Sequence, residues 1–209
     1  MIRFNRTIFD SHAPFCVAVS GGKDSMAVLS FLRSNPRRDI TALHYNHGTP
    51  FADRAQELVE QYCREYRIPL CIGRRSAAMP VGVSREAFWR ESRYSFFEDV
   101  CGSRPVITCH HLDDVVETWI FTSLHGQGRL IPALRDVYVR PFLETRSQDL
   151  ADWCERKSVP FIEDPSNTDT AYMRNYIRHI LMPHALRVNP GLPKTLRKKV
   201  QEMYASFGH

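Results

Sequence analysis

The chain has 209 residues, of which 43% are hydrophobic and 24% charged, and its formal net charge is +5. This is an ordinary globular composition, and the length suits one α/β domain with a small appendage. No run of residues is long and apolar enough to cross a bilayer, and residues 1–6 lack the apolar core of a signal peptide. We therefore expect no membrane partner and a cytoplasmic location.

Six cysteines are scattered along the chain without a C-x-x-C spacing. We expect buried free thiols rather than disulfides or a metal cluster. The charge is uneven, because residues 171–209 contain seven Lys or Arg and only one acid. That excess is consistent either with a polyanionic partner such as RNA or with an ordinary solvated basic helix face.

Strand-like and helix-like segments alternate through the first 125 residues. We predict strands at 15–19, 40–44, 70–72 and 106–109, and helices at 25–33, 52–66, 85–100 and 113–124. This alternation with short connections predicts an α/β fold with a doubly wound parallel sheet. Ligands of such sheets bind beyond the carboxyl ends of the strands, so the loops at 20–25, 44–48 and 110–117 should converge there.

The remainder of the chain is predicted to be mostly helical. We expect a strand at 137–142, a helix at 145–157 opened by a capping box of Thr145 and Gln148, and a helix at 172–186. A last amphipathic helix carries Leu196 and Val200 on its apolar face. The expected division is a catalytic domain at 1–186 and a short basic helical region at 187–209.

A Ser-Gly-Gly-Lys-Asp-Ser segment at residues 20–25 joins the first predicted strand to the first helix. Two glycines at such a turn let backbone N–H groups approach an anion closely, and the helix N-terminus adds positive charge. Lys23 can reach phosphate oxygens, Ser20 and Ser25 can hydrogen-bond them, and Asp24 suits Mg²⁺ beside a phosphate. The segment lacks the spacing of the common P-loop. It resembles instead the pyrophosphate loop of the N-type ATP pyrophosphatases.

A second group of polar residues follows the fourth predicted strand, in the segment His-His-Leu-Asp-Asp-Val-Val-Glu-Thr at 110–118. Asp113 and Asp114 begin a helix, and Glu117 is placed to share a face with either. Helix capping explains one acid but not three. We expect these carboxylates to bind Mg²⁺ or to act as a base on the incoming nucleophile. The adjacent histidines are poorly spaced for zinc. His44 and Asn46, at the end of the second strand, occupy a place that commonly meets the ribose or base of a nucleotide.

Together these segments resemble the catalytic domain of the tRNA(Ile)-lysidine synthetase family. Segment 44–48 resembles its His-x-x-His-Gly motif, and segment 110–118 fits His-His-x-Asp-Asp-x-x-Glu-Thr. Glu-Asp-Pro-Ser-Asn at 163–167, followed by Arg174 and Arg178, is the most family-specific match. Weaker matches are at 90–94, 126–128 and 140–143, with His125 where that family usually has arginine.

The resemblance implies a two-step ligase. ATP adenylates the wobble cytidine of an isoleucine tRNA with a CAU anticodon, and the amine of free L-lysine then displaces AMP to form lysidine. The implied cofactors are ATP and Mg²⁺, with Asp24 and Asp114 as candidate metal ligands. The implied ATP-binding residues are Ser20, Gly21, Gly22, Lys23, Asp24, Ser25, His44, Asn46 and His110. The implied catalytic residues are Asp24, Arg93, Asp113, Asp114, Glu117, Arg174 and Arg178.

The sequence departs from the family in two respects. Lys23 stands where the family usually has a small or apolar residue. A lysine at this position is instead usual in related tRNA thiolation enzymes, but the paired Cys-x-x-Cys motifs of those enzymes are absent from this sequence. The C-terminal tRNA-binding domains usual in the family are also missing from this sequence. The alternatives are therefore a thiolation enzyme, a ligase with a non-tRNA acceptor, and a nucleotide-sensing or RNA-binding module without catalysis. A homodimer or an accessory RNA-binding partner is the expected source of the tRNA contacts that those domains would make.

Overall fold

The computed structural model describes residues 1–75, 82 and 84–207. Its sheet contains β1 (Phe15–Ala18), β2 (Ile40–Asn46), β3 (Leu70–Arg74), β4 (Val106–Ile107), β5 (Leu134–Arg135) and β6 (Tyr138–Val139). The strand order is β3-β2-β1-β4-β6-β5, with parallel pairing except between β5 and β6. The predicted doubly wound parallel sheet is confirmed. Of the predicted strand at 137–142, only the two residues of β6 are a strand. Pro141, two residues after its end, cannot donate a ladder hydrogen bond.

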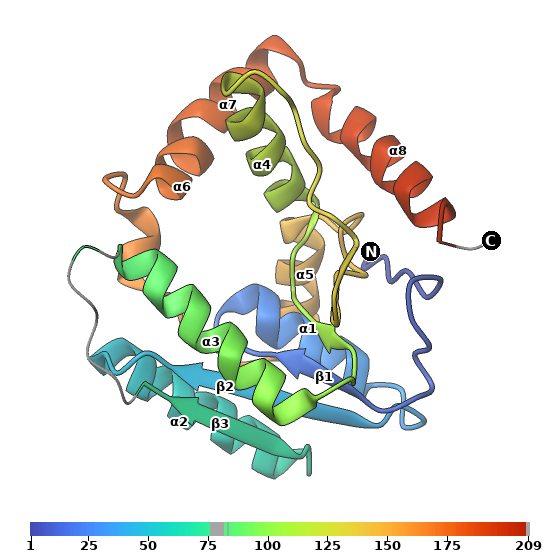
Figure 1. Ribbon diagram of the computed structural model, residues 1–209, viewed down its shortest axis with the longest axis vertical. Helices are drawn as coiled ribbons and strands as arrows, with labels where there is room; N and C mark the ends of the chain where they lie inside the picture. Colours follow the sequence, from blue (N-terminus) through green and yellow to red (C-terminus); the bar gives the residue numbers. More distant parts are fainter. Residues whose placement is uncertain (76–81, 83, 208–209) are drawn as a thin grey trace.

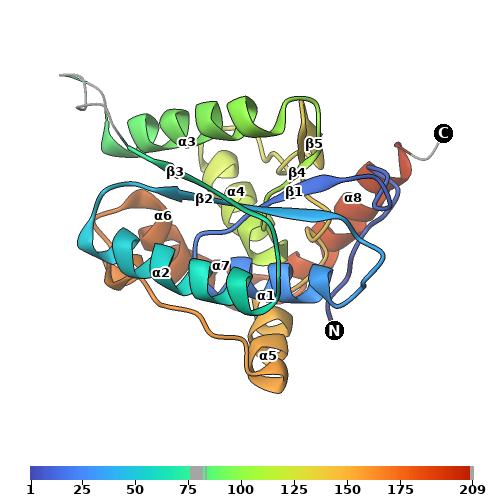
Figure 2. The same cartoon turned by 90° about the horizontal axis from the view of Figure 1, so that it is seen from below.

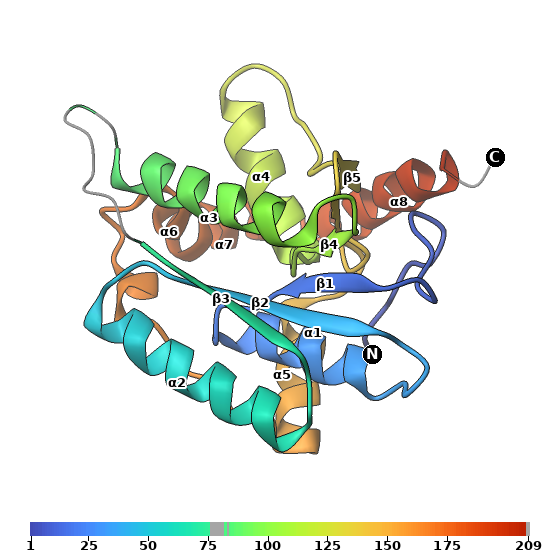
Figure 3. The same ribbon diagram turned by 60° about the horizontal axis from the view of Figure 1, so that its bottom comes forward.

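Alternation along the strands divides the core into two layers. Phe15, Val17 and Val19 face the main core, whereas Cys16 belongs to a second cluster with Leu43 on the other side of the sheet. Helices α1 (Lys23–Arg33), α2 (Pro50–Glu65) and α5 (Ser147–Lys157) cover one face, and α3 (Arg85–Cys101) covers the other (Figures 2 and 3). Both faces are therefore covered, as expected for parallel strands.

A helical layer rises from the carboxyl end of β4 (Figure 1). It contains α4 (Leu112–Leu124), α6 (Met173–Tyr176), a π-helical turn at Ile177–Leu181, α7 (Met182–Val188) and α8 (Leu192–Ala205). A short 3-10 turn at Pro165–Thr168 precedes α6. The predicted helix at 172–186 is thus one helical run whose middle turn is π-helical. Leu196, Val200 and Tyr204 of α8 belong to the main core, because α8 packs against α4.

The predicted capping box of Thr145 and Gln148 is wrong. Helix α5 begins two residues later, at Ser147, and the Asp149 carboxylate accepts the backbone N–H of Arg146. The buried Thr145 hydroxyl is instead used by the N-terminal segment, since it accepts the Arg3 N–H and donates to the Arg3 carbonyl, both at 2.9 Å. Thr145 therefore anchors the start of the chain rather than the helix.

Two other expectations concern bulk properties. All six cysteines are free thiols, and four of them are buried. Within the residues that the structure describes, no helix combines the length and apolar character needed to cross a membrane.

Tyr204 attaches α8 to the sheet. Its hydroxyl donates to the Arg140 carbonyl and accepts the Leu143 N–H at 3.1 Å, in a buried environment. We predict that Tyr204→Phe lowers the free energy of unfolding by about 1–3 kcal/mol, because two buried backbone groups lose their partner. Urea unfolding measures this. Tyr172→Phe, at an exposed tyrosine, is the matched control and should change stability by less than about 0.5 kcal/mol. Equal effects would contradict the assignment.

Candidate active site

The site lies where the strand order reverses. β1 is paired with β2 on one side and with β4 on the other, although β4 follows β3 in the chain. The loops that leave β1 and β4 therefore open on opposite sides of one crevice at the carboxyl ends of the strands, the usual ligand position in such sheets. Helix α1 follows the first loop and α4 follows the second.

The loop at residues 20–25 is held by its two serines. The Ser25 hydroxyl donates to the Gly22 carbonyl at 2.9 Å and accepts the Ser20 N–H at 3.1 Å. Gly22 is the N-cap of α1, and no side chain caps the first turn. The backbone N–H groups at this helix start, beginning with Lys23, are therefore available to an anion, as the sequence predicts for a phosphate.

Gly21 is required for two reasons. Its φ angle is +85°, and a Cβ there would lie 3.2 Å from both the Cβ and the carbonyl oxygen of Ala55 in α2. Its own carbonyl accepts the N–H of Ile162 at 3.0 Å. The loop is thus packed between α2 and the segment after α5, which fixes the shape of the anion cradle.

His111 joins the two loops. Its Nε2 lies 3.3 Å from Oδ2 of Asp24, and its Nδ1 lies 3.5 Å from Oδ2 of Asp114. Burial alone would lower the pKa of His111, but the carboxylates of Asp114, Asp24 and Asp113 outweigh it and raise the pKa to about 9. The imidazolium is therefore the favoured form at neutral pH and holds the acidic start of α4 against the loop of β1.

The two adjacent aspartates have different contacts. Asp113 accepts the Ser147 N–H at 2.8 Å and pairs with Arg146 at 3.0 Å, so it attaches the start of α5. Asp114 accepts the His111 N–H at 3.0 Å and pairs with Arg178 at 3.1 Å. Burial raises the pKa of Asp114, but the charge of His111, the hydrogen bond from the His111 N–H and the charge of Arg178 bring it below its usual value. Each aspartate therefore anchors a different element.

Glu117 is the most enclosed acid of the site, with 3% of its surface exposed. Oε1 accepts from Nε of Arg174 at 2.9 Å, and Oε2 accepts from Nε and Nη2 of Arg178 at 3.1 and 2.9 Å. Two guanidinium groups on consecutive turns therefore share one carboxylate, which places Arg174 and Arg178 on a common face. The π-helical turn that contains Arg178 is a feature often found at functional sites.

His44, Asn46 and His110 have interior contacts. Nδ1 of His44 lies 2.9 Å from the Val19 carbonyl oxygen. His44 in β2 therefore contacts the residue directly before the loop at 20–25. The Asn46 side chain is fully buried and donates to Asp53 and Gln56 of α2. His110 lies 3.0 Å from the Thr108 hydroxyl, and burial lowers its pKa to about 4, so the ring is neutral at pH 7.

Arg93 comes from the opposite side of the sheet, on α3. Burial lowers the pKa of its guanidinium, and the nearby cations Arg90 and Arg174 act in the same direction. Several cations thus approach one another around the crevice. Such mutual repulsion is relieved when an anion binds between them.

Asp24 fits a magnesium ion better than Asp114 does. The Asp24 side chain is 34% exposed beside the anion cradle, whereas that of Asp114 is 10% exposed. Both oxygens of each carboxylate have a partner within the protein, but those of Asp24 are the more accessible. Within residues 1–75, 82 and 84–207, no cluster of three or more His, Cys, Asp or Glu side chains is arranged to bind a metal. Mg²⁺ is commonly held by one or two carboxylates together with substrate phosphates, so a single carboxylate beside the anion cradle is compatible with this ion.

Cys109, directly before His110, is the cysteine that a thiolation enzyme could use as a nucleophile. Its thiol lies 3.4 Å from the Ala18 carbonyl, and burial raises its pKa well above the usual range. A thiol of this kind is a poor nucleophile at neutral pH.

Sequence reasoning missed His111 and Ser147. His111 stands out in the sequence only as a neighbour of His110. Asp114 three residues later, whose carboxylate accepts the His111 N–H at 3.0 Å, was the available signal that a helix begins at His111. The Ser147 hydroxyl donates to Oδ1 of Asp24 at 3.3 Å, although 123 residues separate them. No local pattern in the sequence indicates that contact.

Comparison with known proteins agrees with this geometry. A family model described as a PP-loop domain matches residues 2–185, which include the sheet and the loop at 20–25. The chain belongs to the PP-loop domain family. It is 37% identical over 201 residues to a tRNA(Ile)-lysidine synthase of Geobacter sulfurreducens, covering 88% of this chain and 43% of the relative. It is 34% identical over 188 residues to the tRNA(Ile)-lysidine synthase of a Thermotoga species, covering 83% and 45%. The chain thus spans less than half the length of these curated relatives.

Two solved structures share the fold. The U34-tRNA thiolase NcsA from Methanococcus maripaludis has a TM-score of 0.75 at 15% identity, over 97% of this chain and 76% of that one. The NH3-dependent NAD synthetase from Campylobacter jejuni has a TM-score of 0.52 at 13% identity, over 98% and 90%. At these identities, the likeness concerns the fold alone.

The contact between Gly21 and Ala55 gives a prediction with an internal control. Gly126 also has a positive φ, +93°, but a Cβ there would meet nothing within 4 Å. Gly126→Ala should cost about 1–2 kcal/mol of unfolding free energy from backbone strain alone. Gly21→Ala should cost about 1–3 kcal/mol more, because the new methyl group also collides with α2. Urea unfolding of both variants measures the difference, and equal losses would contradict the close packing of the loop.

Proposed function

We propose that this protein catalyses the ATP-dependent attachment of L-lysine to the wobble cytidine of an isoleucine tRNA with a CAU anticodon. The observation that carries the proposal is the contact of Asp24 with His111, which joins the phosphate loop to the acidic start of α4. The names of the curated relatives support the same reaction.

The first step is adenylation. O2 of the cytidine attacks the α-phosphorus of ATP, the bond to the oxygen that bridges the α- and β-phosphates breaks, and pyrophosphate leaves. The N–H groups at the start of α1, the Lys23 ammonium group and the Ser20 hydroxyl provide hydrogen bonds and positive charge for this leaving group. Asp24 would hold Mg²⁺, which neutralises developing charge on the phosphates.

The second step transfers lysine. The uncharged ε-amine attacks C2 of the adenylated base, the bond between C2 and O2 breaks, and AMP departs with that oxygen while the amine loses its proton. Arg93, Arg174 and Arg178 stabilise the anionic phosphates in this proposal, and Glu117 and Asp114 orient the last two of these arginines. Asp113 acts indirectly, through the start of α5.

The proposed ATP-binding residues act in two ways. Ser20, Gly21, Gly22, Lys23 and Ser25 form the phosphate loop itself. His44, Asn46 and His110 are proposed to support the nucleotide through the positions of the β2 and β4 ends, because their side chains contact other groups of the protein.

The direct test is to incubate the chain with ATP, Mg²⁺, radiolabelled lysine and an unmodified tRNA(Ile) transcript with a CAU anticodon, and to count lysine in the RNA. We expect lysine incorporation matched by AMP release, and no incorporation into a transcript with uridine at the wobble position. Asp24→Asn should lower the rate at least about 100-fold, because the carboxylate proposed to hold Mg²⁺ beside the phosphates is lost.

Asp152→Asn, at an exposed aspartate of α5 bonded to Gln148, is the matched control and should leave the rate unchanged. AMP and pyrophosphate formation without lysine in the RNA, when another acceptor is supplied, would favour a ligase with a different acceptor. Full activity of Asp24→Asn would overturn the role given to Asp24.

A further inference from the structure

Helix α8 carries a row of cations on its outer side. Lys194, Lys198 and Lys199 are exposed, whereas Leu196 and Val200 are buried against α4. Together with Thr195 and Glu202, the three lysines line an open depression on the surface. Among the residues that the structure describes, no carboxylate lies within ion-pair distance of any of these lysines. Their charge is therefore directed to the solvent side of the helix.

This row continues onto the end of α4. Nζ of Lys199 lies 5.7 Å from the ring centroid of Trp119, a cation–π contact. The same ring lies beneath the loop after α4, where a Cβ on Gly128 would come within 2.8 Å of it. Lys199, Trp119 and the loop at 125–129 are thus packed side by side.

The loop itself is well ordered by hydrogen bonds. The Thr122 hydroxyl accepts the Arg129 N–H at 2.8 Å, the Thr122 carbonyl accepts the Gln127 N–H at 3.1 Å, and the Arg129 guanidinium donates to the Gln127 side chain at 3.1 Å. Thr122, His125, Gln127 and Arg129 line a second depression. Beside it, the exposed Phe121 ring packs against His125 with centroids 4.5 Å apart. The loop therefore presents a cation, amide groups and an aromatic edge together.

We propose that this surface, formed by Lys194, Lys198 and Lys199 of α8 with Trp119 and Arg129, binds the phosphate backbone of the RNA substrate outside the catalytic crevice. The inference rests on the proposed function, because RNA is the polyanion which that function supplies. Four cations against one acid, Glu202, with an aromatic ring among them, is the composition expected of an RNA-binding surface. None of these residues belongs to the catalytic set described above.

The test uses fluorescence anisotropy of labelled tRNA(Ile) transcript at several salt concentrations, with the triple variant Lys194→Gln, Lys198→Gln, Lys199→Gln. Each lost phosphate contact makes the slope of log affinity against log salt shallower by about 0.7–0.9, so the triple variant should lose about 2 to 3 in slope. Its affinity near 0.1 M salt should fall on the order of tenfold or more. Arg129→Gln alone should lose about one contact. In the lysine-transfer assay the triple variant should raise the KM for tRNA and keep kcat at saturating tRNA.

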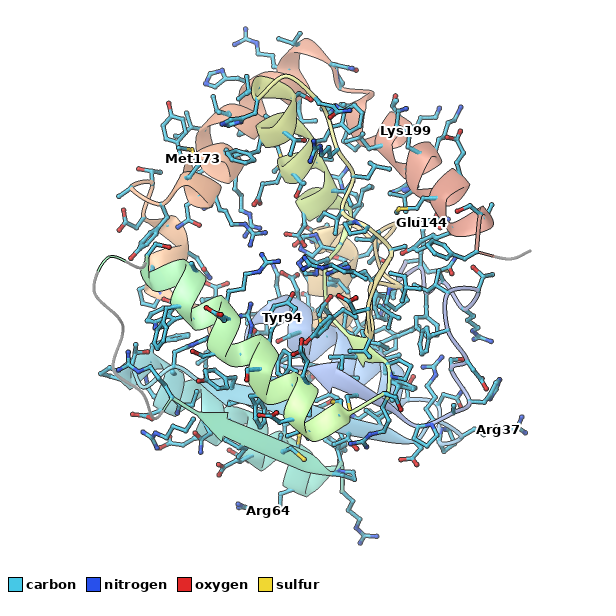
Figure 4. The ribbon with its side chains drawn as sticks, in the orientation of Figure 1. Arg37, Arg64, Tyr94, Glu144, Met173 and Lys199 are labelled. Carbon is cyan, nitrogen blue, oxygen red and sulfur yellow. The ribbon has the colours of Figure 1, made fainter. Side chains whose placement is uncertain are left out.

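The matched control removes the same charge elsewhere. Arg37, Arg64 and Lys157 are exposed, and Lys157 also lies 5.7 Å from a tryptophan ring, that of Trp153. Figure 4 shows Arg37 and Arg64 far from Lys199. The variant Arg37→Gln, Arg64→Gln, Lys157→Gln should leave the slope within experimental error of the unchanged chain. Thermal unfolding of both triple variants checks that they are folded.

Three outcomes would overturn the inference. If the unchanged chain transfers lysine but the α8 variant keeps its salt slope and KM, this surface does not bind RNA, and the proposed function stands. If both triple variants lose slope equally, the effect is net charge and not a defined surface. If the unchanged chain neither binds tRNA nor transfers lysine to it, the surface and the proposed function both fail.

Discussion

The buried carboxylate of Glu117 is the interaction on which the site depends. An ionised acid that is 3% exposed loses most of its hydration, and that loss must be offset by hydrogen-bonded opposite charge. Arg174 and Arg178 supply it, at distances of 2.9 to 3.1 Å. The arginines lie more than fifty residues further along the chain. Their pairing with Glu117 therefore places the α6–α7 helical run against α4.

From Glu117 the contacts run back to the phosphate loop. Arg178 bridges Glu117 and Asp114, Asp114 lies next to His111, and His111 lies next to Asp24 at the start of α1. Acidic and basic groups alternate along this series, so each contact joins groups of opposite charge. Groups from β1, β4 and the C-terminal helices are thereby held at one end of the sheet. An adenylating enzyme needs such positioning, because little of its catalysis comes from covalent chemistry of the protein.

The sequence predicts the sheet well because strand and helix periods alternate cleanly and the phosphate loop marks the end of β1. It also places Asp113, Asp114 and Glu117 correctly at the start of α4. It does not predict that Asp113 anchors α5 while Asp114 anchors the imidazolium of His111, since both depend on contacts with distant segments. The capping box at Thr145 failed for the same reason. A residue suited to a local role is used instead by the N-terminal segment.

The most direct test of the central claim is a double-mutant cycle between Glu117 and Arg178. The free energy of unfolding in urea is measured for the unchanged chain, Glu117→Gln, Arg178→Met and the double variant. If the buried pair fastens the C-terminal helices to α4, the double variant loses less stability than the two single losses together, by at least about 1 kcal/mol. Losses that add within about 0.3–0.5 kcal/mol would show that the two residues act independently and would contradict the account.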